Sequence, residues 1–111
     1  MRNLLAWLMM MILAPAAHAH DAGTGWSYDV FCCNGGRVSG DCQAIPSRSV
    51  RVTRNGYEIT VGPGDHRLVT RPHDFTLPQS NARRSQDEEY HLCLFPNEDT
   101  LRCFYAPDMG Y

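Results

Sequence analysis

The sequence predicts a small, mainly β domain that is braced by disulfide bonds. Helical periodicity is weak along the whole chain, whereas strand signals are better, with two pairs of β-forming stretches that each flank a turn. The chain also has 5 cysteines in 111 residues, which suits a small core that needs covalent support. We therefore expect two β-hairpins, over residues 50–61 and 90–105, whose apolar faces pack together with Trp26, Tyr28 and Phe31.

Residues 1–19 have the pattern of a cleavable signal peptide. A short positive start precedes an apolar run over residues 4–13, and Ala17-His18-Ala19 supplies small residues before the cleavage site. The run is about half as long as the roughly twenty residues that span a bilayer. We expect residues 20–111 to form a single periplasmic or secreted domain, with no membrane span after cleavage.

The first hairpin has the clearest local signal. Asn55-Gly56 stands between two β-forming stretches, and this dipeptide is typical of a two-residue hairpin turn. Pairing Arg54 with Tyr57 then predicts one apolar face, made of Val50, Val52, Ile59 and Val61. After it we expect a third short strand at residues 66–70 and a long loop at residues 71–89.

The second hairpin brings two cysteines together. Pairing Phe95 with Leu101 places Cys93 directly opposite Cys103, within the Cα separation that a disulfide needs. A Cys93–Cys103 bridge is therefore expected. Cys42 is expected to bridge Cys33, with Cys32 as the alternative, because adjacent cysteines rarely bridge each other. The remaining thiol is expected to be buried, although a bond to another chain or to a metal is open.

The composition argues against several classes of function. Ten basic residues stand against 12 acidic ones, and this near balance does not favour a nucleic-acid partner. The chain has no nucleophile elbow, EF-hand spacing or Cys-x-x-Cys pair. Asp87-Glu88-Glu89 is interpreted as a solvated charge run. We therefore expect a protein that is not an enzyme and that needs no cofactor.

A metal site at the new N-terminus is the main alternative. Cleavage after Ala19 makes His20 the first residue, and its α-amino and ring nitrogens can bind Cu(II) together with a second histidine. The predicted metal set is His20 with His91, and His66 and His73 are other possible partners. Of these, His66 is expected to be exposed to solvent and His73 to bond Asp74 or nearby backbone.

The order of these motifs resembles that of small exported proteins of alphaproteobacteria. The matching features are His20-Asp21, Cys32-Cys33, Asp41-Cys42, His91-x-Cys93, Cys103-Phe104 and Ala106-Pro107. The resemblance covers most of the chain after the signal and implies a Gram-negative envelope or secreted setting. It transfers no catalytic residue.

Two functions follow from the sequence. The leading one is a non-catalytic module of the cell envelope that binds another protein or a small ligand. The alternative is a periplasmic copper-binding protein that uses His20.

Overall fold

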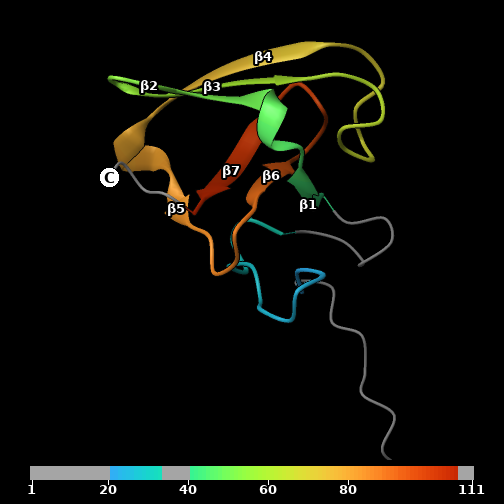
Figure 1. Cartoon of the computed structure of the whole chain (residues 1–111). Coiled ribbons are helices and arrows are strands. Elements are labelled where there is room, and N and C mark those ends of the chain that lie inside the picture. Colours follow the sequence, from blue (N-terminus) through green and yellow to red (C-terminus); the bar gives the residue numbers. More distant parts are fainter. Residues whose placement is uncertain (1–20, 34–40, 108–111) are drawn as a thin grey trace, which may run out of the picture.

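The computed structural model describes residues 21–33 and 41–107, and these residues form two β-sheets packed face to face (Figure 1). The first sheet has the order β1 (Cys42–Ile45), β6 (Tyr90–Leu94), β7 (Leu101–Ala106) and β5 (Arg83–Arg84). The second has the order β2 (Val50–Thr53), β3 (Gly56–Val61) and β4 (His73–Pro78). Single 3₁₀ turns lie at η2 (Ser47–Ser49) and η3 (Gln79–Asn81). The expected mainly β class is confirmed.

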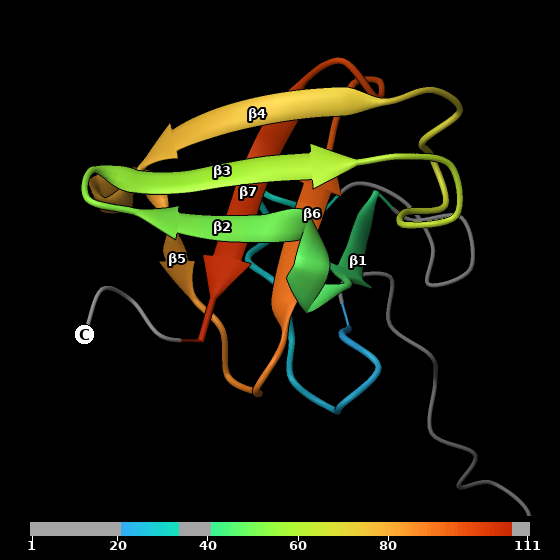
Figure 2. The same ribbon diagram turned by 45° about the horizontal axis from the view of Figure 1, so that its top comes forward.

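The main core lies between the two sheets. Figure 2 shows the strands of the three-stranded sheet running across those of the four-stranded sheet. Alternate residues of each strand face the partner sheet, as the twofold repeat of a strand requires. The fully buried members from β3, β6 and β7 are Tyr57, Ile59, Val61, Leu92, Leu94, Phe104 and Ala106. No described helix is long and apolar enough to cross a membrane.

The first hairpin forms, but its register differs from the prediction by two residues. Thr53 pairs with Gly56 and Val50 with Ile59, so Arg54 and Asn55 form the turn. A shift of two residues keeps every side chain on its predicted face, yet Val52 stays 53% exposed at the sheet edge. Gly56 therefore lies in β3 and not in the turn, and β4 approaches it so closely that a Cβ there would collide with the Leu77 carbonyl oxygen.

The region predicted as a long loop contains a full strand. β4 pairs with β3 along its whole length, from Gly56 opposite Pro78 to Val61 opposite His73. The strand expected at residues 66–70 is absent, since those described residues form turns instead. Prolines had argued against a strand at 73–78, but β4 is an edge strand, where a missing N–H costs little. Its alternating burial brings Phe75 and Leu77 against the core.

The four-stranded sheet is covered on both faces. Its outer face packs against residues 21–33, which we call the covering segment; Figure 1 shows it on the side away from β2–β4. Trp26 and Tyr28 therefore pack on the outer face of β6 and β7, and their predicted place between the hairpins is wrong. Phe31 is 61% exposed and stacks under the Arg102 guanidinium, 3.8 Å from its ring centroid.

Two disulfides join the described cysteines, and their pairing differs from the prediction. Cys93 does lie opposite Cys103, but β6 is a central strand and Cys93 also lies opposite Cys42 on β1. The bridges are Cys42–Cys93 and Cys32–Cys103, with Cα separations of 4.0 Å and 5.5 Å. The expected Cys93–Cys103 bridge and the bridge from Cys42 to Cys33 or Cys32 are therefore wrong. Cys33 keeps a buried thiol.

Candidate functional site

A small pocket lies between the covering segment and the edge of the four-stranded sheet. Its volume is about 220 Å³. The covering segment contributes Asp21, Gly23, Thr24 and Tyr28; β1 contributes Cys42, Gln43 and Ala44; the remaining wall is formed by Arg67, Glu89 and His91. Most of these residues are polar or charged, which is unusual for a contact that serves packing alone.

His91 forms the centre of a buried hydrogen-bonded chain in the pocket wall. It lies on the outer face of β6 and is 1% exposed. Its Nε2 lies 2.9 Å from Oδ1 of Asp87, and its Nδ1 lies 2.8 Å from the Tyr28 hydroxyl. An ionised carboxylate only accepts, so Nε2 donates to Asp87, and the Tyr28 hydroxyl is the hydrogen-bond partner of Nδ1. Burial raises the pKa of Tyr28 well above its usual value, so its hydroxyl stays protonated.

Asp87 gathers donors from several parts of the chain. Thr24 Oγ1 and the Trp26 indole N–H donate to Oδ2 at 2.6 Å and 2.8 Å. Ser85 Oγ and the Glu89 N–H donate to Oδ1 at 2.8 Å and 2.9 Å. Burial alone would raise the pKa of the Asp87 carboxyl, but the hydrogen bonds from Thr24, Trp26 and His91 hold it well below its usual range. The carboxylate therefore stays ionised and fixes the covering segment to the sheet.

Aromatic rings surround the chain from Tyr28 to Asp87. The Trp26 ring lies 5.0 Å from both the Tyr28 and the His91 rings, in edge-to-face contacts. Tyr105 adds a third ring, 5.3 Å from Trp26. These contacts exclude water from the imidazole and strengthen its two hydrogen bonds.

Of the two predicted metal ligands, the structure describes only His91. His20 lies outside the described residues. The carboxylate oxygens of Asp87 and Glu89 and a ring nitrogen of His91 lie within 4.8 Å of one another, a spacing that a metal ion could bridge. However, both nitrogens of His91 and both oxygens of Asp87 already have protein partners. An ion there would have to replace the hydrogen bond between Asp87 and His91.

The other two histidines hold the loops together. His66 was expected to be exposed, but it is 1% exposed and its Nε2 donates to the carbonyl oxygens of Asp41 and Leu92, each at 3.0 Å. Its Nδ1 accepts from the Leu68 N–H at 3.1 Å. This arrangement requires the neutral ring, and burial lowers the pKa of His66. His66 is buried because its loop folds onto β1 and β6.

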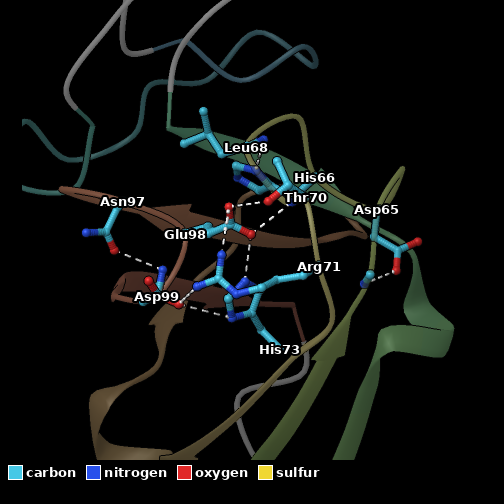
Figure 3. Close-up of polar contacts among 10 residues, drawn as sticks. Asp65, His66, Leu68, Thr70, Arg71, His73, Asn97, Glu98 and Asp99 are labelled. Atoms are coloured by element: carbon cyan, nitrogen blue, oxygen red, sulfur yellow. Dashed lines mark hydrogen bonds and ion pairs between the residues drawn. The ribbon is translucent and has the colours of Figure 1, made fainter.

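His73 bonds a different partner from the one predicted. Its Nε2 lies 2.8 Å from a carboxylate oxygen of Glu98 on the β6–β7 loop, in place of Asp74 or backbone, a contact that can be followed in Figure 3. Glu98 also accepts from the Thr70 N–H and hydroxyl, at 2.9 Å and 2.6 Å. Hydrogen bonds from Thr70 and His73 lower the pKa of Glu98 to about 2. None of these residues lines the pocket, so the cluster is a tie between two loops.

Sequence reasoning missed Tyr28, Trp26 and Asp87 as a unit. Asp87 was interpreted as part of a solvated charge run, but its side chain is only 12% exposed. The available signal was Ser85-x-Asp87-x-Glu89, in which Asp87 bonds the N–H two residues on, a pattern typical of an Asx turn. Comparison with protein-family models, curated proteins and solved structures gives no significant match.

Proposed function

We propose that this chain is an exported, non-catalytic binding module of the cell envelope, and that its ligand is a small polar molecule held in the pocket. The observation that carries the proposal is the buried hydrogen-bonded chain Tyr28–His91–Asp87, of which Tyr28 and His91 line the pocket. Apolar side chains would cover the sheet at lower cost, because each of these polar groups must be desolvated. Such a cost is typical of sites that keep polar groups for recognition.

The charges of the wall favour a particular kind of ligand. Asp21 and Glu89 offer carboxylates, while Arg67 supplies one guanidinium. The wall is therefore negative on balance and suits a ligand with an amine or several hydrogen-bond donors. The volume lies below the range of about 300–1,000 Å³ that holds drug-sized ligands, so the ligand is small.

The setting rests on other features of the chain. The signal pattern of residues 1–19 supports export. The two disulfides are compatible with an oxidising compartment. The resemblance to small exported alphaproteobacterial proteins favours a Gram-negative envelope.

Native mass spectrometry of untagged protein, exported through its own signal, tests the proposal. We expect a bound small molecule in addition to the mass of a chain that begins at His20. Ala44→Trp should abolish the adduct because it fills the pocket. Val52→Trp is the matched control, since Val52 is exposed on β2 and does not line the pocket. An adduct that survives Ala44→Trp would contradict the proposal, as would an empty protein that takes up nothing from periplasmic extract.

Copper binding through His20 is the second candidate, and one observation favours it. Asp21, which directly follows His20 in the sequence, lines the same pocket as His91. A Cu(II) ion on Nε2 of His91 would leave Nδ1–H to donate to the Tyr28 oxygen, the orientation that metal-bound histidines prefer. Stoichiometric Cu(II) uptake that is lost in His20→Ala and kept in His73→Ala would support this candidate. Uptake unchanged by His20→Ala would remove it.

A further inference from the structure

The five cysteines lie close together on the outer face of the four-stranded sheet. All are buried in one cluster with Ala22, Tyr28 and Tyr105. Cys33 carries the thiol, and its Sγ lies within 4.8 Å of both Cys42 Sγ and a carboxylate oxygen of Asp41. A thiol therefore lies beside a disulfide in an enclosed space.

We propose that Cys33 and the Cys42–Cys93 disulfide form an internal exchange pair, which gives the domain a second disulfide arrangement. The Cys33 thiol loses its proton to base in the solvent, and its sulfur attacks Cys42 Sγ. The bond between Cys42 and Cys93 breaks as the bond between Cys33 and Cys42 forms. The Cys93 sulfur leaves as a thiolate and takes up a proton from the solvent, so no oxidant or reductant is consumed.

The exchange changes what holds the edge of the pocket. In the present arrangement Cys42 ties β1 to the central strand β6. After the exchange, Cys42 would tie β1 to the covering segment, and the thiol would lie on Cys93. Because Cys42 lines the pocket, the two arrangements have different pocket walls. This inference does not depend on what the pocket binds.

The surroundings of Cys33 slow the exchange at neutral pH. Burial, together with the charge of Asp41 and a hydrogen bond to it, raises the pKa of the Cys33 thiol to about 11, against a smaller opposing effect of Arg67. Tyr28 belongs to the same buried cluster and interacts electrostatically with the thiol. Since the thiolate is the attacking species, the rate should rise about tenfold per pH unit between pH 7 and 10. The present pairing is thus retained at neutral pH and becomes exchangeable in base.

Peptide mapping of the wild-type protein tests the proposal. Folded protein is held at pH 7, 8, 9 or 10, quenched in acid, unfolded, and its thiol labelled with N-ethylmaleimide. Trypsin cuts after Arg37, Arg48, Arg84 and Arg102, so Cys33, Cys42, Cys93 and Cys103 fall on separate peptides. We expect the label to move from the Cys33 peptide to the Cys93 peptide, about tenfold faster per pH unit, while circular dichroism shows the fold intact.

The Cys33→Ser variant is the control, because it should keep the Cys42–Cys93 bridge and take no label at any pH. If this variant fails to fold, the wild-type map still decides the matter. A label that stays on the Cys33 peptide at pH 10 would overturn the proposal. A label spread over all five cysteines would also overturn it, since that pattern indicates general scrambling.

Discussion

The hydroxyl oxygen of Tyr28 lies 2.8 Å from Nδ1 of His91, and the two residues are 6% and 1% exposed. The other ring nitrogen of His91 faces Asp87. Both polar atoms of the imidazole thus have protein partners. The stability of the covering segment should depend on these two contacts.

Tyr28→Phe should destabilise the domain by about 1–3 kcal/mol, because it leaves Nδ1 of His91 buried without a hydrogen-bond partner. Tyr105→Phe is a suitable comparison. The Tyr105 hydroxyl bonds the backbone N–H and carboxylate of Asp29, a residue that is exposed, so water can replace it. Urea unfolding should show a clearly smaller loss for Tyr105→Phe. Equal losses would mean that the contact to His91 has no special weight.

Asp87→Asn should cost about 2–4 kcal/mol near pH 7, because an amide offers one acceptor oxygen where several donors converge. Asp99→Asn, at an exposed position, should change stability much less. The pKa of Asp87 is lowered by folding, so its contribution is present above about pH 4 and is lost as the pH falls further. The difference between wild type and Asp87→Asn should therefore shrink at pH 3; a constant difference would contradict the argument.

The pH dependence of stability should carry a signature of His66. Burial lowers its pKa in the folded state, so below about pH 6.5 the unfolded chain binds more protons. Stability should accordingly fall as the pH drops from 6.5 toward 5. In His66→Gln this component should be missing, because glutamine does not titrate. Parallel stability profiles for the two proteins would show that His66 is not held neutral.

Gly56→Ala should be strongly destabilising, by about 3 kcal/mol or more, because its Cβ would also lie 2.8 Å from the Gln79 nitrogen. Gly64→Ala has a positive φ of 95° but nothing within 4 Å of its Cβ, so about 1 kcal/mol is expected. Thermal unfolding of both variants separates backbone strain from collision. Similar losses for the two would mean that β4 moves away from Gly56 easily.

The two hairpins could be predicted because their signals are local in the sequence. Asn55-Gly56 and the alternation around it predicted β2 and β3, and the spacing of the last two cysteines predicted the opposition of Cys93 and Cys103. The exact turn was missed, because the close approach of β4 to Gly56 is a tertiary effect. The strand β4 itself was missed because Pro72 and Pro78 resemble loop signals when edge position is unknown.

The disulfides and the pocket depend on contacts between distant parts of the chain. Nothing around Cys42 marks β1 as a strand that pairs with β6, so the second neighbour of Cys93 was not visible. Likewise, Tyr28 and His91 are 63 residues apart in sequence, and their contact exists only once the covering segment lies on the sheet. His91 was selected as a candidate for its chemistry, whereas the hydrogen bonds that occupy it come from the tertiary fold.

The Cys32–Cys103 bridge joins residues that are 71 positions apart in the sequence. It can therefore form only after both ends of the domain have been synthesised. Synthesis starts at the amino end, so the covering segment is made early, long before its partner strand β7 exists. Until then Cys32 and Cys33 are two neighbouring thiols that no sheet covers. Only the arrival of β7 selects one of the pair for bonding and encloses the other, so a chain that stops short of residue 103 would keep both thiols open to wrong partners.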